Sequence, residues 1–433
     1  MLRASPQTLQ SPQSAATAIT GDTLDVGRKI RLTAILLGCA SLAFFLWRIS
    51  DPPLFLYDEP QYVLSAKALL AEAPNPNPEA PPLGKLIVAV GMKAFGDNPL
   101  GWRSMSALFG ALTLVGVFLL AQILLRDYSL ALTAALLTLL NNFVFVMSRV
   151  AMMDIFLVTF LIWGLLAYTA VLTLDNFSNT KRRAVLALSG AAFGFACACK
   201  WNGVDTLGVA FAIGVVILLR GGRTSGESDE IARCAGRLRR VGAAWFVLCL
   251  TVVPIVAYSV TYWPLCRSLH RPFEPRELLA MNMYIWHFHR SVQGNPAITS
   301  AWYSWPLQIA PQRALLYLVG NWSIMFGGLA ALAFCASRLR TSLPEALVVL
   351  LYVGNLLQWA VTPQRCQYYY YYFPAAVFLT LAIPVALHRL PTRVFGVRLS
   401  LLCLLPATCC FLFCYPHMTN LQAPFDCALG CWT

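Results

Sequence analysis

The chain has 433 residues, of which 58% are hydrophobic and only 12% are charged. Soluble domains carry roughly twice this charged fraction, so the composition excludes an ordinary soluble protein and predicts a polytopic membrane protein. The net charge of +13 does not indicate nucleic-acid binding, because much of it sits in short segments between apolar runs, where Lys and Arg set orientation.

The apolar runs predict an all-α membrane domain over residues 28–416. Residues 1–27 are rich in Ser, Thr, Gln, Ala and Pro and are predicted to form a disordered cytoplasmic tail. Backbone groups in lipid must be satisfied within each segment, so every spanning run is expected to be a helix. We predict about eleven transmembrane helices, near residues 30–47, 102–125, 129–148, 150–174, 184–200, 202–220, 241–263, 313–336, 344–361, 371–388 and 399–416.

The distribution of basic residues predicts the orientation. The clusters that fall on one side of the membrane include Arg28-Lys29, Lys181-Arg182-Arg183, Arg237 to Arg240, Arg338 with Arg340, and Arg389 with Arg393. Positive loops face the cytoplasm, so we expect a cytoplasmic N-terminus and an extracytoplasmic C-terminal tail over residues 417–433. Cys427 and Cys431 in that tail could form a disulfide in an oxidising compartment.

Two long loops are predicted on the outer side, over residues 49–101 and 264–312. Within the first, Glu59–Ala71 and Gly84–Phe95 have amphipathic character. We expect both to form helices that lie on the membrane interface. The sequence contains no internal repeat and no appended soluble domain.

Several charged residues near the membrane are predicted to meet at the outer face. Asp58 and Glu59 follow the first apolar run. Placing a charge near the bilayer costs several kcal/mol, so charged residues there are candidates for a functional site. Transporters usually place such residues at the midplane. Convergence at one interface instead indicates an enzyme that takes a lipid-borne substrate and a polar acceptor. The other charged residues that the topology brings to this face are Lys85, Arg103, Arg149, Asp154, Lys200 and Arg365.

Several segments around these residues share one resemblance. They are "YDEPQY", "PPLGKLIVAVGMKAFGDNPLGWR", "SRVAMMDIF" and "CKWNG" between about residues 55 and 205, with weaker similarity in "WYSWPLQIAP" and "QYYYYYFP". In this order they resemble the protein O-mannosyltransferase family, glycosyltransferase family 39, of the GT-C fold. Two departures are Ala80, where the family usually has His, and a short loop where eukaryotic members carry a large lumenal domain.

The resemblance implies inverting transfer of a hexose, most simply mannose, from a polyprenyl phosphate to Ser or Thr hydroxyls of exported proteins. The enzyme would work at the extracytoplasmic face of a bacterial plasma membrane. Asp58 would be the general base that takes the acceptor proton. Glu59 would either position the acceptor or cap the following helix.

The resemblance also implies a site for the donor phosphate. Arg103 and Lys200 would hold this phosphate, whose charge grows in the transition state; the alternative is that both side chains snorkel to lipid headgroups. Lys85 and Arg365 are further phosphate candidates, although Lys85 could simply anchor its helix. Arg149 and Asp154 could pair to shape the site. The tyrosines at 368–372 are more typical of an aromatic belt at the interface.

No nucleotide cofactor and no firm metal site are indicated, and nucleic acid is not an expected partner. Two alternatives remain open from the sequence. One keeps the fold and donor class but transfers the sugar to a lipid or a cell-envelope glycan. The other is a flippase or transporter of lipid-linked sugars, which would need charges at the midplane and a path between two halves of the molecule.

Overall fold

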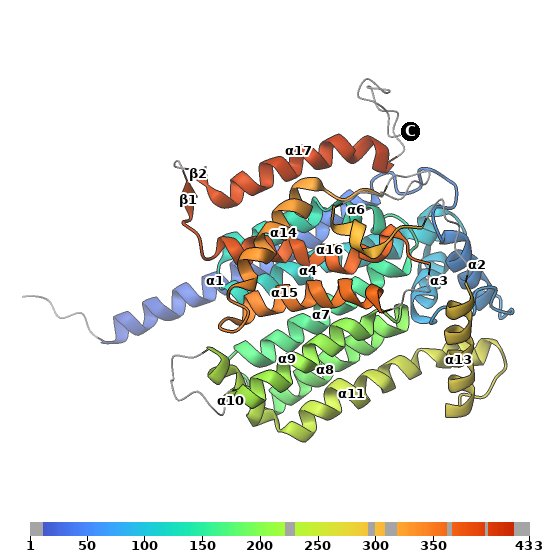
Figure 1. Cartoon of the computed structure of the whole chain (residues 1–433), viewed down its shortest axis with the longest axis horizontal. Coiled ribbons are helices and arrows are strands. Elements are labelled where there is room, and N and C mark those ends of the chain that lie inside the picture. Colours follow the sequence, from blue (N-terminus) through green and yellow to red (C-terminus); the bar gives the residue numbers. More distant parts are fainter. Residues whose placement is uncertain are drawn as a thin grey trace, which may run out of the picture.

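The computed structural model describes residues 12–220, 230–292, 299–307, 318–361, 366–394 and 397–419. Long helices run side by side and form one bundle (Figure 1). The only strands within these residues are β1 (Arg393–Val394) and β2 (Val397–Arg398), which pair antiparallel. The predicted all-α membrane fold is confirmed.

The spanning helices fall where the apolar runs predict them. Within the described residues, nine helical segments are long and apolar enough to cross a membrane. They comprise α1 (Pro12–Leu46), α4 (Pro99–Leu125), α7 (Met153–Thr173), α8 (Asn179–Cys199), α9 (Gly203–Arg220), α11 (Ala243–Val260) with α12 (Tyr262–Ser268), α15 (Leu343–Leu357) with η2 (Gln358–Ala360), η3 (Tyr369–Tyr372) with α16 (Phe373–Leu387), and α17 (Leu399–Thr419). The shorter apolar helices α5 (Tyr128–Leu139) and α14 (Trp322–Ala336) occupy the two remaining predicted spans. The number of crossings, eleven, stays a prediction.

The N-terminal segment differs from its prediction. Helix α1 begins at Pro12, so the expectation of a disordered tail over residues 1–27 is wrong from that residue onward. No proline interrupts the chain between Pro12 and the apolar run, so the spanning helix can extend in the N-terminal direction. Residues 1–11 and 420–433, with Cys427 and Cys431, lie outside the described residues.

Close packing of helix α8 against helix α11 depends on two glycines. A Cβ added to Gly190 would meet the backbone carbonyl of Cys249, and one added to Gly194 would meet that of Pro254. Small residues let two helix backbones approach each other inside a membrane. This contact fixes the axis of α8, and therefore the place of Lys200 at its C-terminal end.

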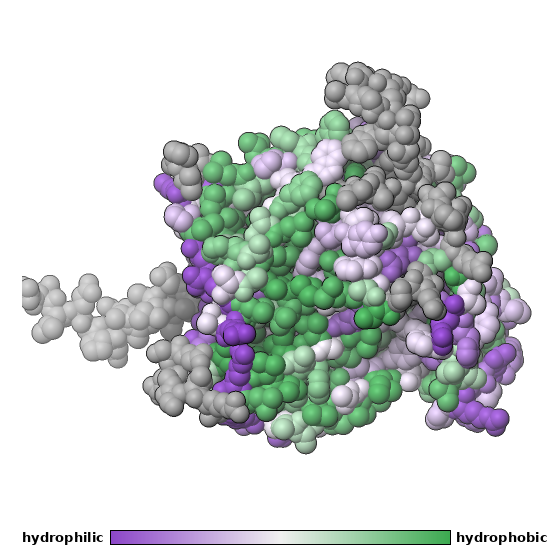
Figure 2. All heavy atoms as spheres, in the orientation of Figure 1, coloured by the Kyte–Doolittle hydropathy of each residue, from purple (hydrophilic) through white to green (hydrophobic). Residues whose placement is uncertain are grey.

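The two ends of the bundle carry different elements. At one end lie α2 (Glu59–Leu70), α3 (Leu83–Phe95) and α13 (Pro275–Ser291), while α10 (Glu230–Val241) and the β1–β2 hairpin lie at the other (Figure 1). Hydrophobic residues cover most of the surface between the two ends in this view (Figure 2). Helices α2 and α3 confirm the two helices predicted between residues 59 and 95, whereas their place on the outer side stays a prediction. The remaining elements are α6 (Asn142–Met147) and η1 (Trp302–Leu307).

The orientation is testable by cysteine labelling. We expect a cysteine placed at the exposed Glu72, just after α2, to react with a membrane-impermeant thiol reagent in intact cells. The control is a cysteine at the exposed Arg240 on α10, which should react only after the cells are permeabilised. The reverse pattern would invert the predicted topology.

Candidate active site

A cavity of about 550 Å³ opens at the end of the bundle that carries α2, α3 and α13. Its wall combines segments that are far apart in the sequence: the start of α2, the loop before α3, the turn between α8 and α9, the end of α13 and the tyrosine run. The lining residues include Tyr57, Asp58, Gln61, Tyr62, Asn77, Glu79, Ala80, Met153, Lys200, Trp201, Asn202, His289, Tyr368, Tyr370 and Tyr371. The predicted convergence on one face therefore holds for Asp58 and Lys200, whereas other predicted residues lie behind the wall.

Asp58 lies at the N-terminal boundary of α2 and is only partly exposed. Its side chain does not cap the helix; instead, the Tyr370 hydroxyl donates a hydrogen bond to Oδ2 at 2.8 Å. Burial raises the pKa of Asp58, and the hydrogen bond from Tyr370 and the charge of Lys200 partly oppose this rise. The nearby Asp154 adds to it. A carboxylate in this setting is suited to accept a proton from a bound hydroxyl group.

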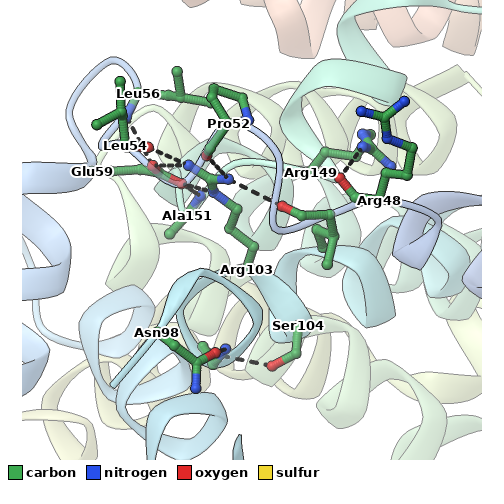
Figure 3. A network of polar contacts seen from close by, with 12 residues as sticks. Arg48, Pro52, Leu54, Leu56, Glu59, Asn98, Arg103, Ser104, Arg149 and Ala151 are labelled. Carbon is green, nitrogen blue, oxygen red and sulfur yellow. Dashed lines mark hydrogen bonds and ion pairs between the residues drawn. The ribbon is translucent and has the colours of Figure 1, made fainter. Parts of the chain in front are cut away.

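Glu59 points away from the cavity into a buried ion pair with Arg103 of α4 (Figure 3). Both side chains are 0% exposed. Arg103 Nε and Nη2 each donate to one oxygen of the carboxylate at 2.8 Å. The same carboxylate accepts the backbone N–H groups of Leu56 and Ala151, both at 2.8 Å. Glu59 is therefore a structural anchor, and its predicted place in the catalytic cavity is wrong.

Arg103 uses its other N–H groups to hold the loop that precedes Asp58. Nη1 donates to the carbonyls of Ile49 and Pro52 at 3.0 Å, and Nη2 also donates to that of Leu54 at 2.6 Å (Figure 3). All five N–H donors of a guanidinium are thus engaged. The side chain does not line the cavity. This geometry contradicts the predicted role of Arg103 in binding the donor phosphate.

Lys200 lies in the cavity wall at the end of α8. Its ammonium group forms an ion pair with Asp154 of α7 at 2.7 Å. It also lies 5.0 Å from the ring centre of Tyr370 and 4.4 Å from that of Tyr371. The side chain keeps 14% of its surface exposed, so its charge is held close to Asp58 and remains open to the cavity.

The predicted pairing of Arg149 with Asp154 is wrong. Arg149 donates instead to the backbone carbonyls of Phe45, Trp47 and Arg48 at the end of α1, at 2.5 to 3.0 Å. Figure 3 shows its guanidinium directed toward Arg48. Asp154 pairs with Lys200 in the cavity wall, while Arg149 fixes the end of α1 and the start of the loop that follows it.

Lys85 lies behind the cavity wall and is fully buried. It donates to the backbone carbonyls of Asn77 and Ala80, two residues that do line the cavity. Burial lowers the pKa of Lys85 to about 7, against the opposing charge of Glu79. The phosphate role predicted for Lys85 is therefore wrong, and the lysine braces the loop that contains Ala80.

The tyrosine run is the part of the site that sequence reasoning missed. Tyr369 to Tyr372 are all buried, and Tyr370 and Tyr371 line the cavity, so they do not form an interfacial belt. The motif "QYYYYYFP" located the segment, but nothing in it indicates which hydroxyl reaches Asp58. Arg365, the last predicted phosphate ligand, lies outside the described residues.

The polar groups that line this cavity include the carboxylates of Asp58 and Glu79, the ammonium group of Lys200, and several amide, hydroxyl and ring groups. Among the residues that the structure describes, no group of three or more His, Cys, Asp or Glu side chains is placed to hold a metal ion. The arrangement can accept a proton at Asp58 and stabilise an anion beside Lys200. These are the two needs of a hydroxyl attack that expels a phosphate.

Comparison with known proteins agrees with this chemistry. Residues 79–270 match the sequence profile of the family described as dolichyl-phosphate-mannose-protein mannosyltransferase, which confirms the resemblance drawn from the motifs. A relative from Mycolicibacterium smegmatis, named polyprenol-phosphate-mannose–protein mannosyltransferase, is 26% identical over 84% of this chain and 83% of its own length.

Two solved structures share the fold. The Saccharomyces cerevisiae protein O-mannosyltransferase Pmt1-Pmt2 complex bound to the sugar donor gives a TM-score of 0.74 at 13% identity, covering 94% of this chain and 92% of the other. ArnT from Cupriavidus metallidurans bound to undecaprenyl phosphate gives a TM-score of 0.60 at 18% identity. This match covers 91% of this chain and 66% of the ArnT chain. Both are membrane proteins of the GT-C type, so the predicted fold family is confirmed.

The role of Arg103 is testable by its effect on stability. Arg103→Ala leaves the Glu59 carboxylate buried without its ionic partner, and breaking such a pair costs about 3–5 kcal/mol. Arg103→Lys should recover little, because one ammonium group cannot reproduce the contacts of the guanidinium. Thermal melting of the detergent-purified variants measures both effects.

The matched control is Arg48→Gln in the same loop. Its ion pair with Asp51 is exposed, with side chains 47% and 50% accessible, so the variant should stay within about 1 kcal/mol of wild type. An Arg103→Ala protein that melts like wild type but binds donor poorly would restore the phosphate role and contradict the anchor.

Proposed function

We propose that this chain, whose residues 79–270 form a domain of the dolichyl-phosphate-mannose-protein mannosyltransferase family, transfers mannose from a polyprenyl-phosphate donor to Ser or Thr hydroxyls of exported proteins. The observation that carries the proposal is the shared cavity of Asp58 and Lys200. It places a proton acceptor and a cation together at the end of the bundle that is predicted to face away from the cytoplasm.

Asp58 acts as the general base in this proposal. As the acceptor oxygen attacks the anomeric carbon, Asp58 takes its proton. The bond between that carbon and the phosphate oxygen breaks on the opposite face of the sugar, and the phosphate leaves with the electron pair. Attack opposite to the leaving group inverts the anomeric centre.

Lys200 stabilises the departing phosphate. The negative charge on the leaving oxygen grows as its bond to the sugar breaks, and a fixed cation lowers the energy of that state. Asp154 and the rings of Tyr370 and Tyr371 hold the ammonium group at the cavity wall. The fold family supports the same donor class, since one structural relative is described with a sugar donor and another with undecaprenyl phosphate.

Another part of the cavity wall is available for the acceptor in this proposal. Asn77, Glu79 and Ala80 form part of it, and Ala80 stands where the family resemblance implies a His. Because the Ala80 side chain is small, the polar groups in this part of the wall are backbone groups, the Glu79 carboxylate and the Asn77 amide. A polar, flexible peptide segment fits such a surface better than an apolar lipid acceptor does.

The proposal predicts a loss of turnover in Asp58→Asn. The variant keeps the shape of the side chain but cannot accept the proton, so transfer to a Ser/Thr peptide should fall by about 10²–10⁴-fold. Donor affinity should change little, because the phosphate lies at Lys200. Radiolabelled polyprenyl-phosphate-mannose measures both quantities with purified enzyme.

Lys200→Met is the matched comparison, and it should mainly weaken donor use. The variant loses a charge-assisted contact worth about 1.5–3 kcal/mol, with thermal melting as the check on folding. Normal turnover in Asp58→Asn would remove Asp58 as the base. Labelled mannose appearing in a lipid or glycan, with none on the peptide, would instead change the acceptor class.

A further inference from the structure

The hydroxyl of Tyr370 links the proposed base to the proposed phosphate site. It donates to Asp58 Oδ2 at 2.8 Å, although the two residues come from opposite ends of the chain. The ring of the same tyrosine lies 5.0 Å from the ammonium group of Lys200. One side chain therefore contacts both Asp58 and Lys200.

Packing fixes the position of this hydroxyl. The Tyr370 ring stacks on Tyr368 with a centroid distance of 5.6 Å and an interplanar angle of 6°. It meets Tyr371 edge to face at 4.7 Å and 80°. Only 5% of the residue is exposed. A ring held from two sides cannot change rotamer without disturbing its neighbours, so the hydroxyl is presented to Asp58 in one place.

We propose that Tyr370 is a positioning residue for Asp58, holding Oδ2 so that the other carboxylate oxygen is directed to the acceptor hydroxyl. This role rests on the proposed function of Asp58 as general base. Because the hydrogen bond is stronger to the carboxylate than to the neutral acid, it also keeps Asp58 in the form that can accept a proton. The tyrosine keeps its own proton throughout the transfer step.

Burial and Tyr370 act on Asp58 in opposite directions. Desolvation raises the pKa of Asp58 toward the range where the group is neutral and cannot act as a base, and the tyrosine bond lowers it. Lys200 also lowers this pKa, and Asp154 raises it. The other titratable groups that line the cavity are Tyr57, Tyr62, Glu79, Cys199, His289, Cys366, Tyr368 and Tyr371. Removing the Tyr370 hydroxyl alone should therefore raise the pKa of Asp58.

Tyr370→Phe isolates the hydroxyl, because the phenyl ring keeps the stacking contacts and the contact with Lys200. We expect the protonation midpoint of Asp58 to rise by about one pH unit, as for a lost hydrogen bond to a charged group. Infrared difference spectra measure this midpoint without any transfer assay, with Asp58→Asn used to identify the carboxyl band. In the transfer assay, the acid limb of kcat/KM should move to higher pH by the same amount.

The matched control is Tyr372→Phe in the same turn. Tyr372 shares a buried hydrogen bond of 2.9 Å with Tyr352, so the variant loses a comparable bond without touching Asp58. It should lower thermal stability and leave the protonation midpoint of Asp58 unchanged. A role in packing alone would make the two variants behave alike.

The protonation midpoints of the two variants decide whether Tyr370 positions Asp58. A raised midpoint in Tyr370→Phe, absent from Tyr372→Phe, supports it. An unchanged midpoint overturns it, as does a uniform loss of rate at every pH. If wild type shows no mannosyl transfer, the proposed function fails, while the infrared midpoints still report whether Tyr370 controls Asp58.

Discussion

The buried ion pair between Glu59 and Arg103 is the interaction on which the site depends. Taking two charges out of water costs several kcal/mol for each ion unless both are fully hydrogen-bonded. Here the guanidinium contacts three loop carbonyls and a carboxylate, and that carboxylate also binds two backbone N–H groups. The pair thus joins the loop after α1 to α2, α4 and the segment before α7.

This anchor explains why two adjacent carboxylates have different surroundings. Glu59 faces the scaffold, so Asp58 beside it has a fixed backbone position at the cavity. Because Glu59 also binds Ala151, three residues before Asp154, the same anchor holds the α7 carboxylate that positions Lys200. Asp58 and Lys200 therefore keep their relative places through one buried network, without any contact with substrate.

The sequence predicted the helices and singled out Asp58, which lines the cavity, because apolar length and an acidic pair near a membrane are local signals. The sequence could not show that Arg103 and Lys200 have different surroundings. Both are cations near helix ends, and only the path of loop 49–58 decides that one is enclosed and the other reaches the cavity. The sequence could not single out Tyr370 either. Five consecutive tyrosines look alike in the sequence, and only the fold decides which hydroxyl reaches Asp58. Residues 12–27 were misjudged because composition does not reveal that an adjoining spanning helix can extend through a polar segment.

The most direct test of the central claim is a cryo-EM structure of the Asp58→Asn protein with polyprenyl-phosphate-mannose bound. We expect the phosphate beside Lys200, the anomeric carbon facing residue 58, and an unbroken Glu59–Arg103 pair behind the wall. A phosphate bound by Arg103, with Glu59 turned into the cavity, would contradict the division between base and anchor.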